Sequence, residues 1–223
     1  MFATARRMTN AAVELRPPRS WDRVLGLLPG YRFYAMYARA SAGEPLIASA
    51  ERRMLDRLAQ AFTFEHLSPS RPEAIEEYVG YRRRPTMTAR DVLDRLAMGR
   101  VALVVRMDGR IVGDVWSADA DYPLPGRNRR LEKVCSAAGY VYSYLAYVAP
   151  EARARGAFPL LLERQFQMAA ASGKRGLFGA VLPTSDASRR SLVRVGFRPF
   201  GALAVVRVAN RSFTRFQLTH PLD

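Results

Sequence analysis

The apolar positions of the chain repeat with periods of two or of three to four residues, and these periods predict where strands and helices lie. Residues 31–40 combine aromatic and small apolar residues and are predicted as a strand. A helix is predicted from Glu44-Pro45 to Phe62, because its apolar residues fall near one face. Two more helices are predicted over 72–81 and from Thr88, as a capping residue, to Gly99.

From Arg100 onward, short apolar runs typical of strands dominate the chain. Asp108-Gly109 joins two such runs and predicts a β-hairpin. Residues 119–138 form a polar stretch, which we interpret as a loop that faces the substrate. The remaining predicted elements are a strand beginning at 140, a helix with Pro159 in its first turn, a strand over 176–182, a helix over 185–195 and a final hairpin of 197–210 with 212–218.

This order of elements predicts the fold class. Helices alternate with strands and the chain ends in a hairpin, so we expect an α/β fold with a mixed central sheet of about seven strands and helices on both faces. We expect residues 29–223 to form this domain. Residues 1–28 contain no acidic residue before Glu14, and Pro17-Pro18 interrupts regular structure in this segment. The segment is therefore predicted to be a basic N-terminal arm.

The stretch between the strand at 140 and the helix at Pro159 carries the clearest chemistry. It reads Arg153-Ala154-Arg155-Gly156-Ala157-Phe158. The free N–H groups of a helix N-terminus favour an anion, and a glycine lets the backbone approach the ligand closely. Two arginines add donors suited to phosphate. This loop is predicted to bind a pyrophosphate, although solvated arginines in an ordinary strand–helix loop would give the same composition.

The amino-acid composition limits the classes of molecule that the protein is expected to bind. Apolar residues make up 49% of the chain, so it is globular rather than disordered. The formal net charge is +15, and nearly all the basic residues are arginine, so the surface should attract anions. Charge alone does not distinguish among four classes of anionic partner: nucleotide cofactors, acidic carrier proteins, nucleic acid and anionic lipid.

The rarer residue types exclude several classes of site. Cys135 is the only cysteine, which excludes an internal disulfide and fits a reducing, cytoplasmic location. His66 and His220 are the only histidines, so a metal site built from several histidines is excluded, and no metal is expected. No run of about 18 apolar residues is present, so no membrane span is expected.

The span 97–218 resembles the GNAT superfamily of acyl-CoA-dependent N-acyltransferases. Three pieces carry the resemblance, in the order in which the family has them. They are the hairpin around Asp108-Gly109, the strand and loop YVAPEARARGAF, and the segment SDASRRSLVRVGFRPFG with its Gly196-Phe197 pair. The resemblance implies a GNAT-like fold and transfer of an acyl group, most simply acetyl, from CoA to a primary amine of a small molecule.

The resemblance also implies roles for particular positions. The backbone of Ala146 would donate to the acyl carbonyl, and the backbone of Val148 would pair with the pantetheine arm of CoA. The amides of 155–158 would hold the pyrophosphate. The cofactor-binding residues implied in this way are Ala146, Val148, Arg153, Arg155, Gly156, Ala157, Phe158 and Ser185.

Several positions depart from the family pattern. Phe158 stands where the loop should end in a small residue, and its side chain must turn into the core if the amides are to stay free. Ser185 stands where the family often has an asparagine near the cofactor. Leu192 stands where it often has a tyrosine that protonates the leaving thiolate, and Tyr142 where some members have a catalytic glutamate.

The catalytic base stays open among several candidates. Tyr142 and Tyr144 alternate with Ala146 and are predicted to line the acyl site. His66 has a suitable unperturbed pKa and falls in the expected acceptor-binding segment. All three are also ordinary wall or surface residues. Asp119 and Asp121 are alternatives for binding the acceptor's ammonium, and Cys135 for an acyl-enzyme nucleophile.

Other readings of the partners remain open at this point. The donor is acetyl-CoA or a longer acyl-CoA, or an acyl carrier protein attracted by the basic surface. A catalytically silent GNAT-like binding module is a further alternative, and a homodimer is open. Nucleic acid is not favoured as a partner, because the arginines are spread along the chain and no recognition motif is present.

Overall fold

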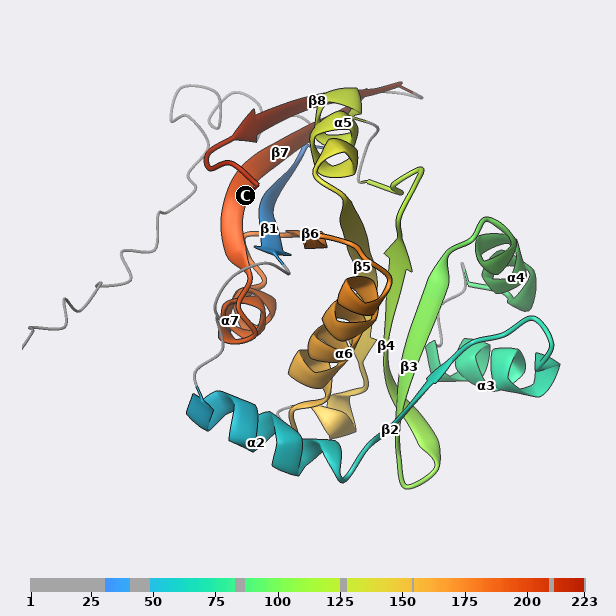
Figure 1. Cartoon of the computed structure of the whole chain (residues 1–223). Coiled ribbons are helices and arrows are strands. Elements are labelled where there is room, and N and C mark those ends of the chain that lie inside the picture. Colours follow the sequence, from blue (N-terminus) through green and yellow to red (C-terminus); the bar gives the residue numbers. More distant parts are fainter. Residues whose placement is uncertain are drawn as a thin grey trace, which may run out of the picture.

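The computed structural model describes residues 31–40, 49–82, 87–124, 128–153, 155–208 and 211–222. Its centre is one mixed sheet with the strand order β2-β3-β4-β5-β6-β1-β7-β8 (Figure 1). The strands are β1 (Arg32–Ala40), β2 (Thr63–His66), β3 (Val101–Met107), β4 (Arg110–Ala118), β5 (Tyr140–Val148), β6 (Gly176–Val181), β7 (Arg198–Val208) and β8 (Arg211–Leu218). Of these neighbours, β5 and β6 pair in parallel and the others pair antiparallel.

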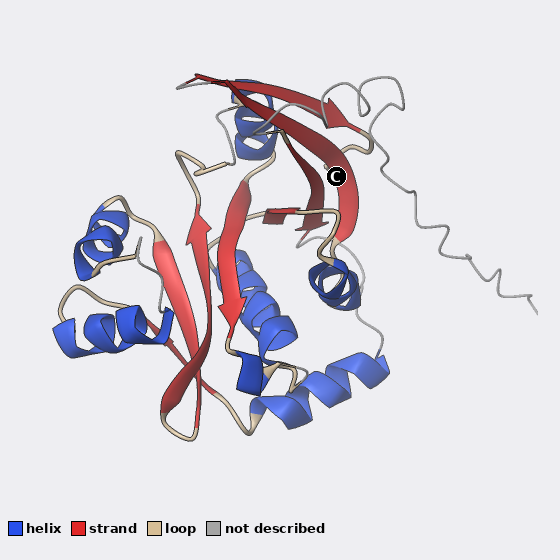
Figure 2. Cartoon of the chain, turned by 180° about the vertical axis from the view of Figure 1, so that it is seen from behind, coloured by secondary structure: helices blue, strands red, loops and turns tan. Residues whose placement is uncertain are grey.

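Helices cover both faces of the sheet, as predicted (Figure 2). One apolar cluster packs α3 (Pro72–Arg82), α4 (Ala89–Ala97) and α5 (Arg129–Ala137) against one face. A second cluster packs α6 (Ala157–Ala171) and α7 (Asp186–Arg194) against the other, where α2 (Ser49–Ala59) also lies. We call these the α3 face and the α6 face. A short 3-10 turn, Pro150–Ala152, links β5 to the loop before α6.

Local sequence signals explain several element boundaries. Thr88 caps α4 through a reciprocal pair of bonds with Asp91, a capping box that satisfies two exposed N–H groups. Asp108 and Gly109 both have positive φ, 51° and 77°, which suits the tight turn between β3 and β4. On β4, a Cβ built at Gly113 would lie 3.1 Å from Leu161 Cδ1, so the absence of a side chain there lets α6 pack close to the sheet.

Two elements differ from the sequence prediction. Residues 119–138 were predicted as a loop, but α5 occupies Arg129–Ala137, with Asn128 accepting a 2.9 Å hydrogen bond from the Leu131 amide as its cap. This helix buries only Leu131 and Cys135, so its apolar period is too weak to detect. The four-residue β2 was also missed, and the sheet has eight strands instead of about seven.

The proposed N-terminal arm, 1–28, lies outside the described residues, as do Glu44 and Pro45. In the part of the chain that the structure describes, no helix is long and apolar enough to cross a membrane.

Candidate active site at the split between β5 and β6

The parallel pair β5–β6 opens partway along its length. The paired residues run from Tyr140 with Gly176 to Ser143 with Gly179. Beyond Ser143, β5 continues to Val148 beside β4, while β6 continues to Val181 beside β1. The two strands therefore part after Ser143, and the sheet has a split that is lined on one side by the last residues of β5.

A β-bulge lies at the point where the split begins. Tyr144 pairs with Trp116 and Tyr147 pairs with Asp114, so Leu145 and Ala146 together oppose Val115. Leu145 has a φ of +52°, a conformation that costs a non-glycine residue roughly 1–3 kcal/mol and persists only when its surroundings enforce it. The bulge is thus a strained feature beside the split.

Side chains from the last turn of α3 hold this bulge. Arg82 Nη2 donates a hydrogen bond of 2.9 Å to the Leu145 oxygen, and its Nη1 lies 3.5 Å from Asp114 Oδ1. Tyr78 donates to Asp114 Oδ2 at 3.0 Å and accepts from Trp116 Nε1 at 2.8 Å. All four side chains are buried. The network fixes the Leu145 carbonyl from the α3 face.

The same peptide unit orients the amide of Ala146. In a trans peptide the N–H points opposite to the C=O, so the Ala146 N–H points away from Arg82. Ala146 is exposed, and it has no partner among the described residue pairs of β5 with β4 and β6. An accessible backbone donor therefore stands at the mouth of the split.

The next residues of β5 present a second backbone site. The Ala149 amide donates to Val112 on β4 at 2.9 Å, so by alternation the polar groups of Val148 point to the opposite side, into the split. Arg153 Nε donates to the Val148 oxygen at 3.2 Å. Arg153 thus reaches back from the loop toward β5 and occupies the Val148 oxygen.

The loop after β5 leads into an uncapped helix N-terminus. Gly156 has a φ of +87° and is the N-terminal cap residue of α6, which has no side-chain capping bond. The first helical bond described there runs from the Leu160 amide to the Gly156 oxygen, at 3.1 Å. The amides of 156–158 donate no hydrogen bond to another described residue and suit an anion. The Arg155 amide, also predicted to hold the pyrophosphate, instead donates to the Ala152 oxygen at 3.4 Å.

The side chains around this N-terminus pack against α2 and the α6-face cluster. Phe158 is half-buried and packs with the α6-face cluster, as required if its ring is to leave the amides accessible. Ala157 is buried. A Cβ built at Gly156 would lie 2.6 Å from Leu58 Cδ1 on α2, so the loop tolerates no larger residue without moving that side chain. Arg155 is exposed beside Met107.

The tyrosines of β5 form an aromatic stack. Tyr142 and Tyr144 lie parallel, with ring centroids 5.4 Å apart and an interplanar angle of 4°. Both are buried on the α3 face, and burial raises the pKa of each phenol. Arg100 and Arg95 lower the pKa of Tyr144 by a smaller amount. Both phenols are therefore protonated at neutral pH.

The other candidate side chains lie farther from the split. His66 is exposed on β2, with β3 and β4 between it and β5, which is roughly 14 Å at ordinary strand spacing. Asp119 pairs with Lys174 at 3.0 Å. Cys135 is fully buried, and burial raises its thiol pKa to about 12, which does not suit a nucleophile. Ser185 begins α7, where its amide donates to the Leu182 oxygen at 2.9 Å.

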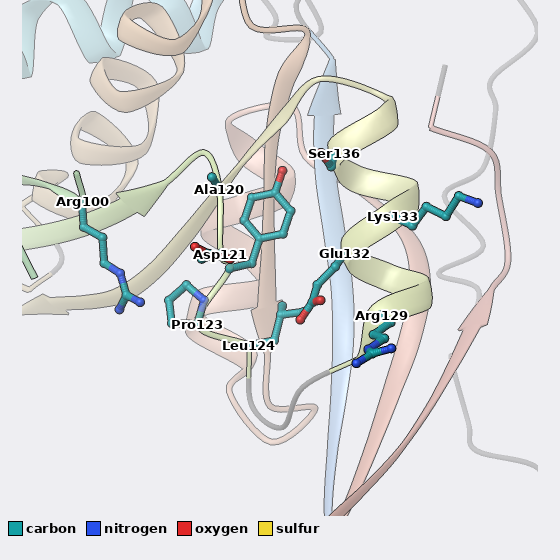
Figure 3. Close-up of a pocket in the computed structure, with 10 residues that line it drawn as sticks. Arg100, Ala120, Asp121, Pro123, Leu124, Arg129, Glu132, Lys133 and Ser136 are labelled. Carbon is teal, nitrogen blue, oxygen red and sulfur yellow. The ribbon is translucent and has the colours of Figure 1, made fainter. Parts of the chain in front are cut away.

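A cavity of about 630 Å³ lies on the α3 face near the first half of β5 (Figure 3). It is bounded by Arg100 at the start of β3, by residues 120–124, and by the exposed side of α5. We call it the α5 pocket. Tyr122 links it to β5, because its ring contacts Tyr142 and Phe178 at centroid distances of 6.2 and 5.1 Å.

Sequence reasoning did not find the α3 residues that hold the bulge. Tyr78 and Arg82 are separated from their partners by 36 and 63 residues, so no local motif marks them. The available signal was an arginine at the end of a helix, which usually indicates a solvated terminus. Among the described residues, no cluster of His, Cys, Asp and Glu is suited to hold a metal.

Comparisons with known proteins place this geometry in a known fold. No protein-family model and no curated protein matches the chain. Among solved structures, a GCN5-related glucosamine N-acetyltransferase region of a fungal multi-domain β-N-acetylglucosaminidase matches 83% of this chain and 20% of that one, with 14% identity and a TM-score of 0.54. The chain has the GNAT fold. The eight-stranded sheet that parts between β5 and β6 is this chain's version of it.

Two further solved structures are less similar to the chain. An aminoglycoside N-acetyltransferase in complex with CoA matches 61% of this chain and 91% of that one, with 16% identity and a TM-score of 0.45. A putative acetyltransferase from Salmonella typhimurium with its cofactor acetyl-CoA matches 71% of this chain and 94% of that one, with 18% identity and a TM-score of 0.45.

Proposed function

We propose that this protein is an N-acyltransferase that transfers an acetyl group from acetyl-CoA to a primary amine of a small molecule. The observation that carries the proposal is the bulge at Leu145-Ala146, which directs an exposed backbone N–H toward the split. A fixed donor at this place is what a thioester carbonyl needs when negative charge develops on its oxygen. The GNAT fold adds to this support, because the matched fungal region is an N-acetyltransferase.

The binding roles follow the order of groups along β5 and its loop. The amides of 156–158, with Arg153 and Arg155, bind the pyrophosphate at the start of α6. The backbone of Val148 pairs with the pantetheine arm, which displaces the Arg153 side chain from the Val148 oxygen. Ser185, at the start of α7, lies beside the cofactor. The Ala146 N–H then holds the thioester oxygen.

The chemistry needs no covalent enzyme intermediate. The lone pair of the neutral amine attacks the thioester carbon, a C–N bond forms and the C–S bond breaks. The sulfur leaves as a thiolate and takes up one proton, while the nitrogen loses one. Because the raised pKa values of Tyr142 and Tyr144 keep both phenols protonated, we assign neither the role of base. His66 is too distant on β2, so the amine's proton passes to solvent.

Thermal stability measured against cofactor concentration tests the proposal. A ligand that binds only the folded state raises the melting temperature with concentration. Acetyl-CoA should do so, and the variant Gly156→Trp should abolish the effect. Gly173→Trp is the matched control, because Gly173 also has positive φ, at the other end of α6, where a Cβ meets nothing within 4 Å. No shift with the unaltered protein would reject the proposal.

A second donor is supported by the charge of the chain. A formal net charge of +15 suits an acidic acyl carrier protein or the phosphates of CoA equally well. The same titration with a long-chain acyl-CoA and with an acyl carrier protein separates these donors. A larger shift with either one than with acetyl-CoA would move the assignment to a longer or carrier-bound acyl group.

A further inference from the structure

We propose that the α5 pocket binds the acceptor, and that the acceptor is an amine that carries its own anionic group, a carboxylate or a phosphate. This inference rests on the proposed function and names its substrate class. Along β5, going from the α6 N-terminus, the Ala146 donor comes first and the pocket comes next. The pocket is next to β5 at Tyr142, because the ring of its lining residue Tyr122 contacts Tyr142.

The side of the sheet supports this assignment. The α6 N-terminus belongs to the α6 face, so the cofactor phosphates and the Val148 contact fill the split from there. An amine must approach the thioester from the side that the cofactor leaves open. Tyr142 and Tyr144 lie on the α3 face, and the α5 pocket is next to Tyr142 through the ring of its lining residue Tyr122. A molecule bound in the pocket is therefore on the correct side to attack.

The charges that line the pocket define the ligand. The basic residues are Arg100, Arg129 and Lys133, and the acidic residues are Asp121 and Glu132. None of these side chains forms an ion pair within the part of the chain that the structure describes. Figure 3 shows Arg100 on one side and Glu132 reaching toward it from α5. Unpaired charges of both signs around one cavity match a ligand that also carries both.

The buried hydroxyl of Tyr144 gives an independent indication. Tyr144 is 9% exposed, and its oxygen has no hydrogen bond of normal geometry among the described residues. Arg100 is close enough to lower the pKa of this phenol against the larger raising effect of burial. A buried donor beside a pocket arginine is satisfied when an acceptor oxygen, such as that of a carboxylate or phosphate, enters.

Matched pairs of acceptors provide the test. Glycine is compared with glycinamide, O-phosphoethanolamine with ethanolamine, and glucosamine 6-phosphate with glucosamine. Binding to the CoA-saturated protein is measured by calorimetry, and transfer from acetyl-CoA by release of free thiol. We expect the anionic member of at least one pair to be favoured by about tenfold or more in affinity and in kcat/KM. The pair that shows the preference tells carboxylate from phosphate.

Variants connect that preference to the pocket. Arg100→Gln and Arg129→Gln should each remove most of the preference, while Arg130→Gln, an exposed residue of the same helix that does not line the pocket, should keep it. Equal binding of charged and neutral amines, or a preference that survives both pocket variants, would overturn the inference. Binding of anionic amines without thiol release would reject the acyltransferase proposal but retain the pocket assignment.

Discussion

Arg82 donates a 2.9 Å hydrogen bond to the backbone oxygen of Leu145, across 63 residues of sequence. Its guanidinium also faces the buried Asp114 carboxylate, with Nη1 and Oδ1 3.5 Å apart. One side chain therefore both neutralises a charge in the core and sets the orientation of the peptide whose N–H we assign to the thioester oxygen. Arg82 is a positioning residue in the proposed mechanism, because it acts through the bulge.

Replacing Arg82 by lysine should separate these two roles. Arg82→Lys keeps a positive charge near Asp114 but loses the planar fork that reaches the Leu145 oxygen. We expect kcat to fall by roughly tenfold or more, toward the loss seen when an oxyanion donor is removed, with a KM for acetyl-CoA within about threefold. Steady-state kinetics, with the melting temperature as control, provide the measurement. A change in KM alone would refute the positioning role.

The ion pair of Arg39 with Glu163 joins β1 to α6, and both side chains are buried. Arg39 also lies over the ring of Phe166, at 3.5 Å from its centroid. Glu163→Gln removes the negative charge that faces the buried Arg39 and should cost about 3–5 kcal/mol of unfolding free energy. The exposed pair of Asp186 with Arg189 is the matched control, and Asp186→Ala should cost much less, because solvent screens this pair. Similar losses in denaturant melts would contradict this.

The buried thiol of Cys135 predicts a pH dependence of stability. Burial raises its pKa from 9.0 to about 12, so the unfolded chain loses this proton first as the pH rises. The contribution is fully present below pH 9 and is lost as the pH rises toward about 12. The difference in unfolding free energy between the protein and Cys135→Ala should therefore shrink across that window. A difference that stays constant with pH would show that the thiol is not perturbed.

Phe158 should contribute to stability more than to cofactor binding. Its ring packs with the α6-face cluster, and the proposed phosphate contact is made by its amide rather than its side chain. Phe158→Ala is expected to cost roughly 1–2 kcal/mol of unfolding free energy, less than a fully buried phenylalanine. The dissociation constant of CoA, measured by calorimetry, should change by less than about threefold. A tenfold change would indicate that the ring itself contacts the cofactor.

Elements with strong local signals could be predicted from the sequence. The cap at Thr88 and the turn at Asp108-Gly109 were confirmed, because each depends on a few adjacent residues. The strand–loop–helix around Gly156 was also predicted, although the left-handed conformation of this glycine was not. The mixed sheet follows from the order of these elements, and the GNAT fold was implied by the resemblance of three sequence segments to that family.

Features that depend on distant contacts could not be predicted. Leucine does not favour positive φ, so neither Leu145 nor the adjacent sequence predicts its strained backbone conformation. α5 has few apolar residues and is stabilised by its contacts with β5 and by the Asn128 side chain, whose amide reaches Thr214 on β8 at 3.0 Å. The α5 pocket then exists only because this helix stands where a loop was expected.

The bulge in β5 also changes how its sequence should be aligned with other strands. Tyr140, Tyr142 and Tyr144 face α3, and so does Tyr147, whose ring lies 5.6 Å from that of Tyr81. The tyrosines are thus spaced by two, two and three, and the extra residue compensates for the inserted one. Deleting Leu145 would restore a regular ladder and keep every tyrosine on its face, at the expense of the exposed amide. An evolutionary lineage that lost this single residue would keep its fold and lose the proposed chemistry.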